Sequence, residues 1–188
     1  MNVYDFDKTI YDGDSTLDFY LFVLARNCTL IRYFPKQIFY MILHYSNIVT
    51  KEKYKETFYS FLKGIKNIEK EIEEFWLKNE KKIKRWYLIQ KDKKDVIISA
   101  SPEWLLKPII DKLEINLIAT KVDKKTGKFH SLNCYGKEKV KRFKKEFPNE
   151  VVENFYSDHQ SDTPMFLISQ NAWLVQGERI IKWIDRKE

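Results

Sequence analysis

The sequence has few of the residues that mark disordered, fibrous or disulfide-linked proteins. Its 188 residues include 5 glycines, 5 prolines and 2 cysteines, and so little glycine and proline argues against a disordered chain or a fibre. Cys28 and Cys134 form no C-x-x-C pair or other metal-ligand spacing. In a cytosolic chain, we expect two such cysteines to be buried thiols rather than a disulfide.

The sequence also lacks an apolar run long enough to cross a bilayer. Its most apolar region extends over residues 17–49, but four charged side chains interrupt it. The uncharged piece at 37–50 is shorter than the ~20 residues that a membrane-spanning helix requires. The N-terminus carries acids where a secretory signal peptide needs a basic head and an apolar stretch. We therefore expect a cytoplasmic protein with no membrane partner.

Apolar and charged residues are both plentiful. Hydrophobic residues make up 44% of the chain and aromatic residues 15%, enough for a packed core. The formal net charge of +7 suits an anionic phosphate substrate, but it is also common in proteins that bind nucleic acid. Because the lysines alternate with glutamates in segments such as 51–70 and 78–94, we interpret them as solvated helix faces and expect no nucleic-acid partner. The sequence does not indicate an oligomeric state.

Two hydrophobic periodicities divide the chain. From residue 17 to about residue 89, apolar side chains recur every three or four residues with Glu and Lys between them, which predicts several packed helices. On either side, short β-branched or aromatic runs predict strands that alternate with helices. The predicted strands are 3–6, 95–99, 116–120, 154–156 and 173–175, with helices at 102–113 and 139–147 and a turn at 124–128.

Strands that alternate with helices predict an α/β fold with an open, Rossmann-like parallel sheet. We therefore predict a core domain formed by residues 1–13 and 90–188. Residues 14–89 are then an all-helical cap domain, inserted after the first strand.

Two acids, Asp5 and Asp7, stand at the end of the first predicted strand. Side chains two residues apart on a strand share a face, so both carboxylates should point to the edge where open α/β sheets bind ligands. Acids this close repel each other unless a cation lies beside them, and Mg²⁺ is a hard cation that prefers oxygen ligands. On this segment alone, two solvated aspartates at a strand end are the alternative.

Three further segments place polar groups after a strand or at a helix start. The Ser99 hydroxyl and the N–H groups of the next helix form an anion site, unless Ser101 merely caps that helix. The two lysines of segment 137–139 oppose a helix dipole, so a phosphate or carboxylate is expected to hold one of them, although surface lysines are the alternative. Asp158 and Asp162 are a second acid pair, of which Asp162 also suits a helix cap.

Together these segments resemble the four motifs of the haloacid dehalogenase superfamily. Asp5-x-Asp7-x-Thr9 is similar to its first motif, and Ser99 to its second. Segment 156–164, Tyr-Ser-Asp-x-x-x-Asp-x-Pro, is similar to the fourth motif of the phosphoserine phosphatase-like branch. That branch inserts a helical cap just after the first strand, which matches the long gap between Asp5 and Ser99.

The resemblance implies a role for each acid. Asp5 attacks phosphorus and forms an aspartyl-phosphate. Asp7 protonates the leaving oxygen and later deprotonates the hydrolytic water. Asp158, the Asp5 side chain and the main-chain carbonyl of Asp7 hold Mg²⁺.

The resemblance also implies roles for the remaining polar residues. A lysine and Ser99 bind the non-bridging phosphate oxygens, and Lys139 fits the pattern Cys-x-Gly-x-x-Lys-Val better than Lys137, which is the alternative. Asp162 orients a metal-bound water or Lys139. Thr9 steadies the loop of the first motif.

Two positions depart from the family pattern. His159 replaces a glycine that many relatives carry, and it is either a solvent-facing or a catalytic side chain. Asp14 stands where phosphoserine phosphatases carry a glutamate that holds the substrate's amino group, and its side chain is one methylene shorter. The resemblance therefore implies a substrate-binding role for Asp14 but leaves phosphoserine itself in doubt.

These observations predict a Mg²⁺-dependent phosphatase that hydrolyses a small phosphomonoester. One alternative is a phosphoryl transferase, which passes the phosphoryl group from Asp5 to an acceptor other than water. Another is a non-catalytic protein that binds a phosphorylated ligand. The cap sets the substrate, which the sequence does not identify.

Overall fold

The computed structural model describes residues 1–183, which contain a six-stranded sheet in the order β3-β2-β1-β4-β5-β6. Neighbouring strands from β3 through β5 are parallel, and β6 runs antiparallel to β5 at the edge. The strands are β1 Asn2–Tyr4, β2 Val96–Pro102, β3 Asn116–Thr120, β4 Val152–Ser157, β5 Ser169–Gln176 and β6 Arg179–Lys182.

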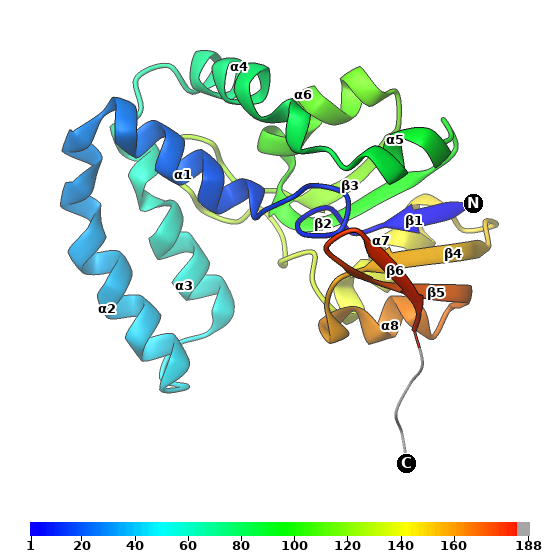
Figure 1. The fold of residues 1–188 in the computed structure, drawn as a ribbon. Coiled ribbons are helices and arrows are strands. Elements are labelled where there is room, and N and C mark those ends of the chain that lie inside the picture. The colour runs from blue at the N-terminus through cyan, green and yellow to red at the C-terminus, as the bar shows by residue number, and fades with distance from the viewer. Residues whose placement is uncertain (184–188) are drawn as a thin grey trace.

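Helices fill the long connections between the strands (Figure 1). The α-helices are α1 Ser15–Arg26, α2 Phe34–Tyr45, α3 Lys51–Phe58, α4 Ile68–Asn79, α5 Arg85–Gln90, α6 Glu103–Leu113, α7 Lys137–Glu146 and α8 Thr163–Phe166. Short 3-10 helices occur at η1 Cys28–Tyr33, η2 Tyr59–Gly64, η3 Glu80–Lys82 and η4 Gln160–Asp162. Within residues 1–183, no helix combines the length and the apolar character that crossing a membrane requires.

Successive residues of the central strands pack against helices on opposite faces of the sheet. Tyr4 and Ile97 belong to a hydrophobic cluster with α4, α5 and α6. Val3 and Ile98 belong to a second cluster with α8 and with Phe143 of α7. Burial on both faces explains why these strands are continuous apolar runs in the sequence. The predicted α/β fold with a parallel, Rossmann-like core is confirmed.

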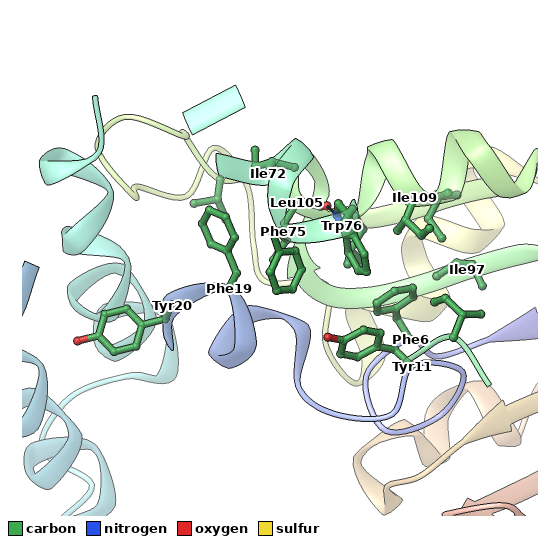
Figure 2. Packing of buried hydrophobic residues seen from close by; sticks show 14 of the residues in the cluster. Phe6, Tyr11, Phe19, Tyr20, Ile72, Phe75, Trp76, Ile97, Leu105 and Ile109 are labelled. Carbon is green, nitrogen blue, oxygen red and sulfur yellow. Dashed lines mark hydrogen bonds between the residues drawn. The ribbon is translucent and has the colours of Figure 1, made fainter. Parts of the chain in front are cut away.

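An aromatic cluster fixes the loop that follows β1 (Figure 2). Phe6 stacks on Tyr11 with ring centroids 5.6 Å apart, and Trp76 meets both rings edge-on. Phe75 extends the cluster to Phe19 of α1, with 5.5 Å between centroids. Such pairs each add about 1 kcal/mol beyond the area they bury. The aromatic packing therefore holds the β1 loop against both α1 and α4.

The segment 14–89 packs in two different ways. Residues 15–64, with α1, α2 and α3, form a helical lobe that lies beside the sheet in Figure 1. Helix α4 instead packs against α1 and α6, and α5 packs against β1. Trp76 Nε1 donates to Leu105 O at 2.6 Å, and Tyr87 packs edge-on against an aromatic ring of β1.

Two details differ from the sequence-based expectations. Strand β6 was not predicted, because it is a short edge strand that is largely exposed and follows a turn at Gly177, where φ is 62°. Cys134 is buried as expected, but the expectation that Cys28 is buried was wrong. Cys28 begins η1 at the surface of the helical lobe. Both cysteines are free thiols, as expected.

Candidate active site

The acids of both predicted pairs meet at the carboxyl ends of adjacent strands. β1 lies between β2 and β4, and the Asp5 N–H donates to Tyr156 O at 2.9 Å, which sets Asp5 beside the end of β4. Asp7 follows on the same loop, and Asp158 directly follows β4, with Asp162 in η4. All four aspartates therefore lie at the edge where open α/β sheets bind ligands.

Asp5 is almost buried, and its two carboxylate oxygens have different surroundings. Oδ1 accepts a hydrogen bond from Lys139 Nζ at 2.7 Å, whereas Oδ2 has a long contact of 3.5 Å from the Thr9 hydroxyl. Burial raises the pKa of Asp5 to about 7, and the positive charge of Lys139 opposes this rise. Oδ2 is thus the less constrained oxygen.

Lys139 is a buried lysine between two carboxylates. Its Nζ lies 2.7 Å from Asp5 Oδ1 and 2.7 Å from Asp162 Oδ2. Burial disfavours the ammonium, but the two carboxylates outweigh burial and raise the pKa of Lys139. Lys137, by contrast, is exposed at the start of α7. Of the two candidate lysines, the structure brings Lys139 to the acids.

Asp162 has one oxygen fully engaged and one without a protein partner. Oδ2 accepts from Lys139 Nζ and from the Ser157 hydroxyl at 2.8 Å. Oδ1 is buried and has no hydrogen-bond partner among residues 1–183. Since a buried acceptor without a donor costs free energy, this oxygen is suited to a water molecule or the hydration shell of a cation.

Asp7 is held by donors from two distant parts of the chain. Oδ1 accepts from the Ser15 N–H at 2.6 Å, and Oδ2 accepts from the Ser101 hydroxyl at 2.5 Å. Ser101 also shares a hydrogen bond of 3.0 Å with the Thr16 hydroxyl. Burial raises the pKa of Asp7 to about 6, and the charge of Asp14 adds to the rise. Asp7 is therefore oriented by the start of α1 and the end of β2.

Ser99 is buried within β2, which continues to Pro102 rather than ending at Ser99 as the sequence predicted. Its hydroxyl oxygen accepts a hydrogen bond from the Ser101 N–H at 3.1 Å. Ser101 does not cap α6, since Pro102 occupies the cap position and no side-chain bond closes that end of the helix. The alternative role of Ser101 as a helix cap was wrong.

Asp158 and His159 have different environments. Asp158 is half-buried, and burial raises the pKa of its carboxyl while the charge of Lys8 opposes the rise. The His159 ring is exposed, and its Nδ1 accepts from the Ser161 N–H at 3.0 Å, which caps η4. Of the two roles left open by the sequence, this contact favours the solvent-facing one.

The donor set at the ends of β1 and β4 fits a hard cation. Asp5 and Asp158 supply carboxylates from adjacent strand ends, and Asp162 Oδ1 is buried with no donor from residues 1–183. Oxygen donors of this kind suit Mg²⁺. In the part of the chain that the structure describes, no three acidic, histidine or cysteine side chains are clustered so that they alone hold a metal ion. A cation here would need main-chain oxygen and water as further ligands, such as the carbonyl of Asp7.

A pocket of about 320 Å³ opens beside Asp7, between the helical lobe and the end of β2. Lys55 of α3 brings a positive charge to it, and its Nζ donates to Ala100 O at 3.0 Å and Asn133 Oδ1 at 3.3 Å. Burial lowers the pKa of Lys55 to about 8. Asp14 also lines the pocket and caps α1. The lining comprises Asp7, Asp14, Thr16, Leu17, Tyr54, Lys55, Phe58, Tyr59, Ala100 and Ser101.

Comparison with protein families gives a match that spans most of the chain. The model of the family described as haloacid dehalogenase-like hydrolase matches residues 3–167, which include most of β1 and both acid pairs. The chain belongs to the haloacid dehalogenase-like hydrolase family. It is thus a member of an enzyme family, as the motifs predicted. No curated protein matches this hydrolase.

Three solved structures share the fold of this haloacid dehalogenase-like hydrolase. A protein with unknown function from Bordetella pertussis Tohama I is 20% identical, with a TM-score of 0.69 over 92% of this chain and 87% of that chain. A phosphoserine phosphohydrolase-like protein from Francisella tularensis is 16% identical, with a TM-score of 0.56 over 92% and 86%. A phosphoserine phosphatase, in a structure described as a phospho-aspartyl intermediate analogue, is 13% identical, with a TM-score of 0.50 over 90% and 83%.

Lys84 is a second buried lysine, and it supports the motif loop of this hydrolase. Its Nζ donates to Lys8 O and to Gly177 O, each at 2.7 Å. Lys8 has φ 58°, a left-handed conformation that is uncommon for residues other than glycine. Lys84 thus ties the loop between Asp7 and Thr9 to the β5–β6 turn.

Sequence reasoning missed Lys55 and Lys84 at this site. The chain has 34 lysines and arginines, and these two reach the site through long side chains from other elements, so no local pattern distinguishes them. Ser101 did carry a signal. It stands two residues after Ser99, past the end of the predicted strand 95–99 but within β2, and a strand prediction that extended to 102 would have placed both hydroxyls on one face.

Proposed function

We propose that this hydrolase cleaves a phosphomonoester through an aspartyl-phosphate formed on Asp5, with Mg²⁺ as its cofactor. The proposal rests on one observation: Asp5 and Asp7 lie on the same loop but are bound by different partners. Asp5 bonds to Lys139 at 2.7 Å, while Asp7, on the same loop, is held by Ser15 and Ser101. The reaction requires a nucleophile and a distinct acid–base group, and these two residues supply both.

The proposed reaction has two displacements at phosphorus. First, Asp5 Oδ2 bonds to phosphorus while the bond from phosphorus to the alcohol oxygen breaks. Asp7, whose pKa burial raises to about 6, gives its proton to that oxygen as the alcohol leaves. Then a water oxygen attacks phosphorus, Asp7 takes the water's proton, and the bond to Asp5 breaks. Inorganic phosphate leaves and both aspartates regain their initial states.

Positive charge and hydrogen-bond donors surround the transferred group in this proposal. The Lys139 ammonium and the Ser99 hydroxyl bind the non-bridging oxygens. Asp5, Asp158 and the main-chain carbonyl of Asp7 would hold Mg²⁺, which supplies positive charge that offsets repulsion between the nucleophile and the phosphate.

Two further residues position these groups. Asp162 holds the Lys139 ammonium through Oδ2, and its buried Oδ1 is available to a metal-bound water. Thr9 contacts Asp5 Oδ2 at 3.5 Å and orients the carboxylate. Neither residue needs to touch phosphorus for these roles.

We assign substrate selection to the helical lobe of residues 15–64. This narrows the cap predicted at 14–89, because α4 bonds to α6 and α5 packs on β1, so we group both helices with the core. The pocket of about 320 Å³ suits a small metabolite. Lys55 attracts an anionic substrate, and Asp14 offers an acceptor to a substrate donor, as the resemblance implied.

The test is release of inorganic phosphate from a panel of phosphorylated metabolites, with Mg²⁺ and with a chelator. Wild type should hydrolyse at least one of them with Mg²⁺ and none with the chelator. Asp5→Asn should lose nearly all turnover and remain folded, because the amide has the same shape and is a poor nucleophile. Asp12→Asn, at an exposed aspartate of the same loop, is the matched control and should stay active. Wild-type turnover in Asp5→Asn would contradict the proposal, and transfer to an acceptor without phosphate release would identify a transferase.

A further inference from the structure

One side of α2 is apolar and exposed. Phe34, Phe39, Met41, Ile42 and Tyr45 are 45%, 57%, 37%, 55% and 79% exposed, and their spacing spreads them over about half of the helix circumference. We refer to these five residues as the α2 face. Figure 1 shows α2 at the outer side of the helical lobe, away from the sheet. Apolar side chains gathered in this way mark an interaction surface more often than a plain solvated helix.

The opposite side of α2 is fixed by specific contacts. Gln37 is buried, accepts from the Tyr20 hydroxyl at 2.8 Å and donates to Phe58 O at 2.8 Å. His44 stacks on Tyr54 with ring centroids 5.3 Å apart. The helix therefore has a defined orientation, and rotation to bury the α2 face would break these contacts.

The charges in the chain segment that contains α2 are of one sign. No aspartate or glutamate occurs between Asp18 and Glu52. Arg32 and Lys36 are exposed beside the face, and neither forms an ion pair with any of residues 1–183. Their guanidinium and ammonium groups instead lie over the rings of neighbouring tyrosines. This segment, residues 19–51, thus combines apolar, aromatic and basic groups without an acid.

We propose that the α2 face binds the surface of an anionic lipid bilayer. Helices that lie in the bilayer interface combine an apolar stripe, aromatic rings with polar tips and basic flanks, and α2 has all three. With 12 residues, α2 is suited to lie on the bilayer rather than cross it. The expectation of no membrane partner rested on the lack of a spanning run, which does not bear on a surface-bound helix.

A second copy of this chain fits the α2 face less well than a bilayer. A two-fold dimer through this face would set the same patch of each copy against the other. Arg32 and Lys36 would then meet positive counterparts, and segment 19–51 supplies no acid to separate them. Like charges across an interface disfavour association. Anionic lipid head groups supply the complementary charge.

Vesicle co-sedimentation of the full chain tests the proposal. The protein should sediment with vesicles of phosphatidylglycerol and phosphatidylcholine, less with phosphatidylcholine alone, and less again as salt rises. Ile42→Glu should weaken binding about tenfold. Ile89→Glu, the same change at an exposed isoleucine of α5, should bind as wild type does. Lys36→Glu should also weaken binding, whereas Lys78→Glu on α4 should not.

Each outcome decides for or against the membrane surface. Absence of sedimentation with anionic vesicles overturns the proposal, and so does equal weakening by Ile42→Glu and Ile89→Glu. A dimer in sedimentation velocity that Ile42→Glu dissociates would assign the face to a second copy instead. Ile42 does not line the pocket beside Asp7, so turnover of a soluble phosphomonoester should be unchanged in Ile42→Glu. This proposal and the proposed function therefore fail separately.

Discussion

At the scale of single residues, the protonation of the two aspartates of the first motif depends on different contacts. Asp7 has both oxygens bonded to donors, from Ser15 and Ser101, and these favour its carboxylate, yet burial still raises its pKa to about 6. Asp5 has Lys139 on one oxygen, while burial raises its pKa to about 7. A pKa near the working pH lets one group both give and take a proton, which is the part proposed for Asp7.

Replacing Asp7 tests its proposed role as general acid and base. Asp7→Asn should lower kcat/KM by roughly 10²–10⁴, the usual value of a positioned acid–base group. The loss should be smaller for p-nitrophenyl phosphate than for an alkyl phosphate, because a good leaving group needs little protonation. Ser101→Ala, which removes one donor to Asp7 but keeps the carboxyl, should cost less. An equal loss across leaving groups would show that Asp7 serves another purpose.

The acids of the site could be predicted from the sequence because each follows a strand that is itself predictable. Asp5, Asp7 and Asp158 lie close together because the carboxyl ends of parallel strands meet at one edge of the sheet. Lys55 could not be predicted, because its contacts at Ala100 and Asn133 depend on how the lobe packs against the core.

At the scale of elements, helix α3 connects the helical lobe to the core. Lys55 Nζ reaches Ala100 O at the end of β2, and Glu56 Oε1 accepts from the Phe129 N–H at 3.1 Å in the loop after β3. Successive residues of one helix therefore contact two segments of the core. The position of α3 sets the width of the pocket beside Asp7.

The pH profile tests the contribution of Lys55. Burial lowers its pKa to about 8, so the ammonium is charged below pH 8 and neutral above it. Loss of the Asp7 proton already lowers kcat/KM above pH 6. If the Lys55 charge attracts the substrate, kcat/KM should fall more steeply as pH rises through 8. Lys55→Met should lose about tenfold or more in kcat/KM at pH 7 and lack the steeper fall near pH 8. Lys53→Met, at an exposed lysine of the same helix, should keep the wild-type profile. Identical profiles for the two variants would remove Lys55 from substrate binding.

The strands were predictable where they are buried and not where they are exposed. The predicted strand 116–120 coincides with β3, because its apolar run is bounded by turns. Strand β6 has four residues and largely exposed side chains, so it lacks the apolar pattern that burial imposes. The sequence also did not separate the helical lobe from α4 and α5 within 14–89. Helices that pack on the core and helices that pack on one another show the same periodicity.

Across the whole molecule, a net charge of +7 coexists with a local concentration of acids. Asp5, Asp7, Asp158 and Asp162 lie at one edge of the sheet, and Lys139 bonds two of them. Like charges about 4 Å apart repel by about 4 kcal/mol at an effective dielectric constant of 20. A cation at this edge should therefore stabilise the entire fold.

Thermal unfolding tests the cation site. Mg²⁺ should raise Tm by an amount that grows with its concentration, as a ligand of the native state must. Asp158→Ala should abolish both the shift and turnover, because it removes a direct ligand. Asp162→Ala should weaken Mg²⁺ affinity by roughly 10–100-fold without erasing it. Asp12→Ala, at an exposed aspartate, is the control. Equal stabilisation of wild type and Asp158→Ala would place the metal elsewhere.

The covalent intermediate on Asp5 is the central claim, and chemical trapping tests it directly. Enzyme quenched during turnover is treated with borohydride, which reduces an aspartyl-phosphate to homoserine, and the N-terminal peptide is analysed by mass spectrometry. We expect homoserine at position 5 in wild type with substrate, and none without substrate or in Asp5→Asn. Phosphate release with unmodified Asp5 throughout turnover, or homoserine at another aspartate, would contradict the account.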